Sequence, residues 1–174
     1  MQKMAPIPEG VTINVDGFKV DVKGKAGELN RDFYSQLFFK KIKITKEDTQ
    51  VVVSTESEKR KVKSAVGTIA SHIRNMVTGV QEGFTCQLKI AYVHFPMTAK
   101  VNGSIVLINN FLGEKNPRKA NILDGCKVEV KKDIVFVTGI NKELVMQTAA
   151  NIENATRITS RDRRVYQDGI FILK

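Results

Sequence analysis

The chain has 174 residues, of which 42% are hydrophobic and 26% are charged, a composition that supports a folded core and excludes a wholly disordered chain. Its 28 Lys and Arg residues outnumber 18 Asp and Glu residues, and the net charge of +10 favours a polyanionic partner, most often a nucleic acid. No apolar run approaches the length of a membrane span, and the N-terminus lacks the apolar core of a signal peptide. We therefore expect a cytoplasmic protein without a membrane partner.

The first half of the chain predicts a hairpin, further strands and a long helix. Alternating apolar residues flank Asp16 and Gly17, a pair that fits a type I′ turn between two strands. Thr55 and Glu58 have the spacing of a capping box at the start of the helix. The predicted elements are, in order, a Pro-containing lead, two strands within 11–22, a polar loop over 24–32, a strand within 34–44, a buried strand over 50–55 and a helix over 58–78.

The second half predicts the same elements again. Asn102 and Gly103 form the turn of a second hairpin, and Asn141 precedes a run in which small and apolar residues recur at helical spacing, so that its side chain caps a second helix. The predicted elements are a strand over 85–95, two strands within 97–108, a loop over 113–121, strands over 127–131 and 134–138, a helix over 141–155, a basic tail over 157–164 and a final apolar strand.

The two halves therefore read as a duplication. At a single offset, five residues of the segment 17–30 recur in the segment 103–116, including the glycine of each turn. The predicted fold class is α+β, with two tandem copies of a small antiparallel sheet and one helix packed on it. We expect the first repeat over residues 1–82 and the second, with a basic C-terminal tail, over 83–174.

No pattern in the sequence indicates catalysis. His72 and His94 lack Cys, Asp or Glu partners at the spacing of metal ligands, and neither a phosphate-binding GxxxxGK[ST] loop nor a GxSxG elbow occurs. Cys86 and Cys126 lie far apart without a CxxC spacing, which is typical of reduced structural thiols. We expect no enzyme, no metal site and no cofactor.

Two basic segments are candidates for RNA binding, the loop over 113–121 and the tail over 157–164, which holds four arginines in eight residues. Their cations would anchor phosphates, Asn and Tyr side chains would contact sugars or base edges, and two glycines would allow close backbone approach. The candidate residues are Asn109, Gly113, Lys115, Asn116, Arg118, Lys119, Arg157, Arg161, Arg163, Arg164, Tyr166 and Gly169.

Two alternatives remain open from the residues. A third basic segment, 58–63, begins the first helix, where cations oppose the helix dipole, and we interpret it as a solvated face. The whole protein could also be a free-standing interaction scaffold that binds through exposed strand edges and carries charge only for solubility.

Five segments are the most specific parts of the sequence: EGFT (82–85), HFPM (94–97), NFLGEKNPRKA (110–120), QTAANIE (147–153) and RDRRVYQDGI (161–170). Together they closely resemble the large-ribosomal-subunit protein six family in its archaeal and eukaryotic form. The resemblance covers nearly the whole chain, although Asn141 stands where the family usually has aspartate and Met146 where glycine is common. It implies a structural constituent of the large ribosomal subunit, with the second repeat as the main RNA-binding repeat. It also implies a place near the sarcin–ricin loop, beside other ribosomal proteins and where translation GTPases dock.

Overall fold

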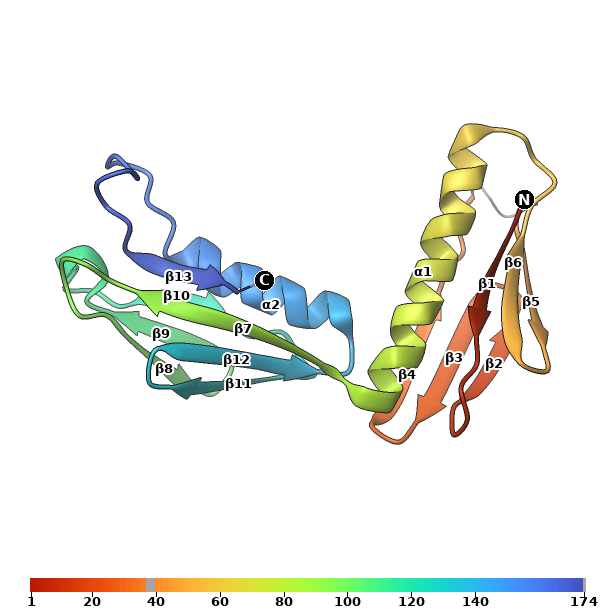
Figure 1. Cartoon of the computed structure of the whole chain (residues 1–174), viewed down its shortest axis with the longest axis horizontal. Helices are drawn as coiled ribbons and strands as arrows, with labels where there is room; N and C mark the ends of the chain where they lie inside the picture. Colours follow the sequence, from red (N-terminus) through yellow and green to blue (C-terminus); the bar gives the residue numbers. More distant parts are fainter. Residues whose placement is uncertain (37–39, 174) are drawn as a thin grey trace. The chain divides into compact units, whose positions relative to one another are not determined.

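The computed structural model describes residues 1–36 and 40–173, and the chain divides into two compact units, Met1–Gly83 and Phe84–Lys174 (Figure 1). Within the described residues, each unit runs through six strands and then one helix, and the second unit adds a last strand. The α+β fold class with two tandem copies is confirmed. Each unit is described by itself below.

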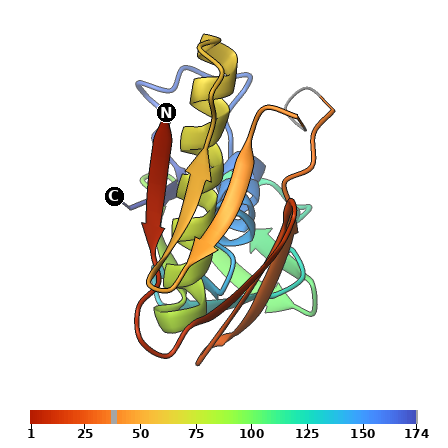
Figure 2. The same ribbon diagram turned by 90° about the vertical axis from the view of Figure 1, so that its right-hand side faces the viewer.

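Unit 1 consists of two three-stranded antiparallel sheets and one helix. The sheets have the strand orders β1-β6-β5 and β2-β3-β4, and α1 contacts β1, β3, β4 and β6, so it packs on both sheets (Figure 2). The core is rich in valine, which suits half-buried strands. The elements are β1 (Gln2–Pro6), β2 (Thr12–Asp16), β3 (Lys19–Gly24), β4 (Gly27–Asp32), β5 (Lys43–Glu47), β6 (Gln50–Ser54) and α1 (Arg60–Glu82).

Unit 2 repeats this arrangement with one more strand. Its sheets have the orders β10-β9-β8 and β11-β12-β7-β13, and α2 contacts both of them. The side chain of Asn141 accepts a hydrogen bond from the backbone N–H of Glu143, which confirms the predicted cap. The elements are β7 (Phe84–Ala91), β8 (Thr98–Asn102), β9 (Ile105–Asn109), the 3-10 turn η1 (Phe111–Gly113), β10 (Arg118–Asn121), β11 (Cys126–Lys131), β12 (Ile134–Gly139), α2 (Lys142–Ala155) and β13 (Gly169–Ile172).

The pairing of the strands confirms the duplication. β1 pairs with β6 in unit 1 as β7 pairs with β12 in unit 2. In the other sheet of each unit, three consecutive strands pair in antiparallel fashion, β2-β3-β4 in unit 1 and β8-β9-β10 in unit 2. The sequence pattern began the first copy at residue 11 and missed β1. In that strand only Ala5 is buried, so its apolar pattern is too short to indicate a strand.

Both hairpin turns differ from the prediction by one residue. Asp16 pairs with Lys19 and Asn102 pairs with Ile105, so the two-residue loops begin at the glycine. Gly17 and Gly103 have φ values of +60° and +58°, while the residue after each has a negative φ. A glycine with positive φ at the first central position defines a type II′ turn in both units, and the type I′ turn predicted at Asp16-Gly17 is wrong.

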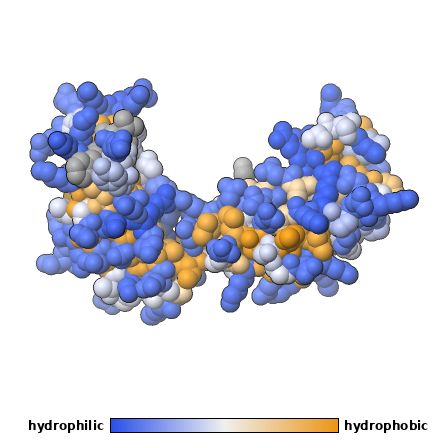
Figure 3. Space-filling model, turned by 180° about the vertical axis from the view of Figure 1, so that it is seen from behind, coloured by the Kyte–Doolittle hydropathy of each residue, from blue (hydrophilic) through white to orange (hydrophobic). Residues whose placement is uncertain are grey.

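Two strands with a polar composition were predicted as loops. The predicted loop over 24–32 contains β4, and the predicted loop over 113–121 contains β10. Both lie at the edge of a sheet, where backbone pairing with a single neighbour holds the strand while its side chains stay largely in water. The face of each unit seen in Figure 3 is accordingly mostly hydrophilic, with smaller hydrophobic patches between.

The first helix begins and ends later than predicted. Its N-cap is Lys59 with no side-chain cap, because the hydroxyl of Thr55 instead donates to the carbonyl of Lys41 at 2.5 Å. The capping box of Thr55 and Glu58 is therefore wrong, and the helix continues past residue 78 to Glu82.

Three further predicted strands are present in the structure, and a fourth is present only in part. The strands expected over 50–55, 127–131 and 134–138 are confirmed. The strand expected within 34–44 falls partly on residues 37–39, outside the described residues. Its described part shows a strand only from Lys43 onward.

Candidate nucleic-acid interface

Three connecting segments meet at one end of unit 2 (Figure 1). Residues 92–97 join β7 to β8, residues 110–117 join β9 to β10, and residues 156–168 join α2 to β13. The side-chain amide of Asn110 donates to the carbonyl of Pro96 at 3.0 Å, which ties the first two segments together. We call these three segments the loop end.

A buried carboxylate ties the third segment to the first. Asp168, with a side chain 3% exposed, accepts hydrogen bonds from the backbone N–H groups of Val93 at 2.6 Å and His94 at 3.2 Å. The His94 Nδ1 lies 2.8 Å from the second carboxylate oxygen. Burial alone would raise the pKa of Asp168, but the hydrogen bonds from His94 and from the two backbone groups outweigh it and lower the pKa. Asp168 is therefore a charged group that the loop end is built around.

This carboxylate acts on the tail through stacked rings. The His94 and Tyr166 rings lie 4.9 Å apart between centroids with an angle of 32° between planes. The Arg161 guanidinium lies 4.8 Å from the centre of the Tyr166 ring, within the range of a cation–π contact. A continuous series of contacts thus runs from buried Asp168 to an exposed arginine.

The base of the tail is fixed by the end of α2. The hydroxyl of Thr156, 3% exposed, donates to the carbonyl of Glu153 at 3.0 Å and accepts from the N–H of Ile170 at 2.9 Å. A carboxylate oxygen of Glu153 accepts from the N–H of Ile172 at 3.3 Å. These two N–H groups of the edge strand β13 are therefore satisfied, which closes this edge to strand addition and removes it as a site for the scaffold alternative.

Arg118, predicted to bind phosphate, has its partners inside the protein. Its guanidinium forms a two-point ion pair with Glu114, at 2.8 and 2.7 Å, and donates to the carbonyls of Ala155 and Arg157 at 2.9 and 3.3 Å. It also stacks 4.2 Å from the Phe111 ring centre. Arg118 therefore joins β10 to the C-terminal end of α2, and we assign it a positioning role.

The charge of the tail also acts on the 110–117 segment. Hydrogen bonding to Arg118 lowers the pKa of Glu114, and the positive charge of Arg161 adds to this effect. Arg161 therefore lies close enough to Glu114 for their charges to interact, although they are far apart in sequence.

The other predicted cations are exposed and lie in two groups. Lys115 and Lys119 belong to the β9–β10 region, and Arg157, Arg161, Arg163 and Arg164 belong to the tail. Arg164 lies 3.5 Å from Asp162, but its side chain is 93% exposed, so this ion pair is weak. Among the described residues, the side chains of Lys115, Lys119, Arg157 and Arg163 have no ion pair.

The predicted polar and glycine positions divide between surface and interior. Asn116 is exposed, whereas Asn109 and Tyr166 are half-buried. Gly113 is exposed with φ +79°, a conformation that glycine adopts easily, so it remains a candidate for close backbone approach. Gly169 is buried, and a Cβ there would lie 3.0 Å from the Phe171 ring, so its small size serves packing rather than contact with RNA.

Sequence reasoning missed the contact between His94 and Asp168. The two residues are 74 positions apart in the sequence, so no local spacing of residues indicates their contact. The only available signal was their presence in two separate segments of the family resemblance.

The part of the chain that the structure describes holds no group of three or more His, Cys, Asp or Glu residues able to bind a metal ion, and none of its helices is long and apolar enough to cross a membrane. Both cysteines are free thiols, and burial raises the pKa of Cys86. A duplicated α+β fold with a basic loop end has the exposed positive charge that a structural nucleic-acid-binding protein needs.

Comparison with known protein families identifies the family of this chain. The family model described as Ribosomal protein L6 matches residues 7–83 and 95–169, once in each unit, and the chain belongs to this family. It is therefore a ribosomal protein and not an enzyme, and binding of ribosomal RNA is typical of its family.

Curated relatives are similar over almost their full length. The "Large ribosomal subunit protein uL6" of Methanospirillum hungatei JF-1 is 50% identical over 99% of this chain and 96% of the relative. The protein of the same name from Methanobrevibacter smithii is 48% identical over 96% of this chain and 92% of its own length. That from Aeropyrum pernix is 50% identical over 95% and 90%. The resemblance to the archaeal and eukaryotic form of the family is confirmed.

The positioning role of Arg118 predicts a loss of stability on substitution. Arg118→Met removes four hydrogen bonds from a side chain that is 30% exposed, and should lower the free energy of unfolding by about 1–2 kcal/mol. Lys119→Met, next to it on β10 and exposed, should change it by less than ~0.5 kcal/mol. Urea unfolding of both variants measures the difference, and equal effects would remove the assigned role.

Proposed function

We propose that the chain is a structural constituent of the large ribosomal subunit, in the cytoplasm, that binds and orders ribosomal RNA mainly through the loop end of unit 2. Its membership of the ribosomal protein L6 family supports the assignment to the large subunit and the choice of ribosomal RNA as the ligand. The geometry of the loop end supports its role as the RNA-binding surface.

The observation that carries this proposal is the pairing of acids at the loop end. Glu114 is bound by Arg118, Asp162 by Arg164 and Asp168 by His94. Arg157, Arg163 and Lys115 are left with no carboxylate partner among the described residues. An exposed surface with a surplus of unpaired arginine and lysine attracts a polyanion, and the arginine fork matches phosphate oxygens.

All the predicted residues except Gly169, which serves packing, then take a role at this surface. Asn109, Asn116 and Tyr166 add contacts to sugars or base edges, Gly113 allows the backbone to approach, and Arg118 holds the surface in shape. The phosphate-binding residues are Lys115, Lys119, Arg157, Arg161, Arg163 and Arg164.

The finer location is also a proposal. We place the loop end near the sarcin–ricin loop, with neighbouring ribosomal proteins beside the chain and translation GTPases nearby. The resemblance over nearly the whole chain supports this location. Because the loop end belongs to unit 2, we assign the main RNA contacts to residues 83–174 rather than to residues 1–82. Protection of the sarcin–ricin loop from chemical probes upon binding would test it.

Binding should depend on salt. With ~4–6 phosphates neutralised, and roughly −0.7 to −0.9 contributed by each, the slope of log affinity against log salt should be about −3 to −5. Titration of purified large-subunit RNA at several potassium concentrations measures it. A flat dependence would favour the scaffold alternative, as would a protein that sediments apart from large subunits in a lysate gradient.

A further inference from the structure

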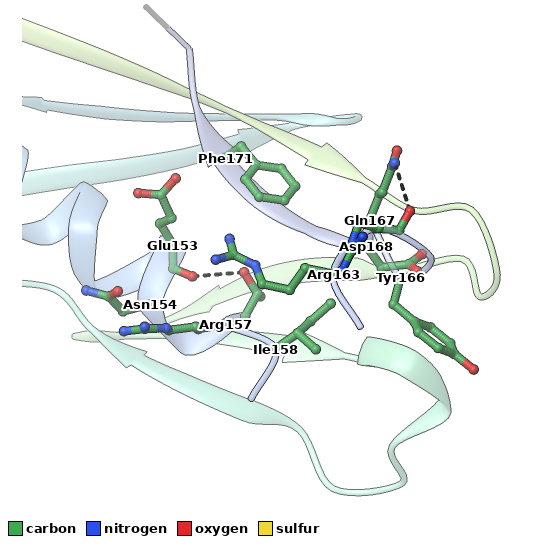
Figure 4. A pocket seen from close by; sticks show the side chains of 11 residues that line it. Glu153, Asn154, Arg157, Ile158, Arg163, Tyr166, Gln167, Asp168 and Phe171 are labelled. Carbon is green, nitrogen blue, oxygen red and sulfur yellow. Dashed lines mark hydrogen bonds between the residues drawn. The ribbon is translucent and has the colours of Figure 1, made fainter. Parts of the chain in front are cut away.

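A cavity of about 630 Å³ opens between the C-terminal end of α2, the tail and β13 (Figure 4). It lies at the base of the loop end, next to the residues that fix the tail to α2. Its volume is within the range of pockets that hold small ligands, roughly 300–1,000 Å³. The side chains around it combine positive charge, an aromatic ring and an amide.

The charge of the cavity is positive. The side chains of Arg157 and Arg163 extend along it in Figure 4, and neither has a carboxylate partner among the residues that the structure describes. Arg164 also lines the cavity, so three arginines stand against two carboxylates, Glu153 and Asp168, and both carboxylates accept hydrogen bonds from backbone N–H groups. The cavity is therefore suited to an anionic group.

One wall of the cavity is aromatic. Phe171 projects from β13 with 39% of its surface exposed, and its ring lies against Gly169, where a Cβ would approach it to 3.0 Å. Gly169 thus leaves the space in which the ring lies. Ile158 is the other apolar residue of the wall, and Asn154 presents an amide without a side-chain hydrogen bond to any described residue.

We propose that this cavity holds a single unpaired nucleotide of RNA. Its phosphate lies on Arg157 and Arg163, its base stacks on Phe171, and Asn154 contacts the edge of the base. A regular RNA duplex would use the two arginines but not the aromatic face, because its bases are stacked on one another and its major groove is closed to side chains. The inference rests on the proposed function, and it adds that the RNA element bound here carries a looped-out or bulged residue.

Substitutions of Phe171 in the full chain test the role of the ring. Base–aromatic stacking is worth about 1–3 kcal/mol, so Phe171→Leu should weaken binding to purified large-subunit RNA roughly 5- to 150-fold, whereas Phe171→Trp should retain it. Leucine keeps an apolar side chain of similar size, and thermal unfolding of each variant checks that the fold is intact. An affinity of Phe171→Leu equal to that of the unmodified protein would overturn the proposal.

A double-mutant cycle separates this proposal from the proposed function. Because one nucleotide contacts both residues, Phe171→Leu combined with Arg163→Ala should cost less than the product of the two single losses. Fully independent losses would overturn the single-nucleotide site while leaving RNA binding in place. If the unmodified protein fails to bind the RNA at all, the proposed function itself is wrong.

Discussion

Replacing Arg161, Arg163 and Arg164 with alanine should weaken binding to large-subunit RNA by about 1.5–3 kcal/mol for each charged hydrogen bond lost, and less where water substitutes. The three side chains are exposed, and the acids that act on them are Asp162, which pairs weakly with Arg164, and Glu114, whose charge interacts with that of Arg161. The tail is held at both ends, by Thr156 directly after α2 and by Asp168 before β13, so its arginines lose less conformational entropy on binding.

The matched control is the basic start of α1. Alanine at Lys59, Arg60 and Lys61 removes the same number of charges from exposed positions in unit 1 and should cost clearly less. These cations lie at the N-terminus of a regular helix, whose dipole opposes them, and follow Glu56 and Glu58 in the sequence. Affinities of both triple variants are compared at one fixed salt concentration, with folding checked for each. Equal losses would show that the tail is not the dominant surface.

Asp168→Ala should have the largest effect on stability of any single substitution at the loop end. It removes the acceptor of three hydrogen bonds and leaves the N–H groups of Val93 and His94 without it, so the free energy of unfolding should fall by about 3 kcal/mol. RNA binding should also weaken at temperatures where the variant is folded, because Tyr166 and Arg161 lose the support of the His94 ring. Asp124→Ala, at an exposed turn, is the control and should change stability by less than ~0.5 kcal/mol.

The lowered pKa of Asp168 gives this prediction a pH dependence. Because the folded pKa lies below the unfolded one, the stabilisation is complete above the unfolded value and is lost as the pH falls through the folded value, below about pH 4. Asp168→Asn keeps one acceptor oxygen but has no charge to lose. The difference in unfolding free energy between the unmodified protein and Asp168→Asn should therefore shrink on acidification. A difference that stays constant from pH 7 to pH 3 would contradict the account.

The duplication and the second helix could be predicted because their signals are local. Asn141 caps α2 through the backbone N–H two residues later, and the glycine of each hairpin turn needs no distant partner to be recognised. The edge strands β4 and β10 could not, since backbone pairing across the sheet holds them while their side chains resemble those of a loop.

The candidate site was predictable in composition but not in organisation. The exposed cations were found by counting charges, whereas the internal role of Arg118 depends on the carbonyl of Ala155, 37 positions away. The contact of His94 with Asp168 spans 74 positions, and neither residue type indicates the other at that distance. Which arginine holds the fold and which is left free is decided by tertiary packing.

Site-specific photo-crosslinking in assembled large subunits tests the central claim most directly. A photoreactive residue replaces Val165, which directly follows the tail and is 61% exposed, or Lys61, which is exposed at the start of α1. Neither change removes one of the tail arginines. The account predicts efficient crosslinking to ribosomal RNA from position 165 and much weaker crosslinking from position 61. RNA crosslinks from position 61 with none from position 165 would contradict the assignment of RNA binding to the loop end of unit 2.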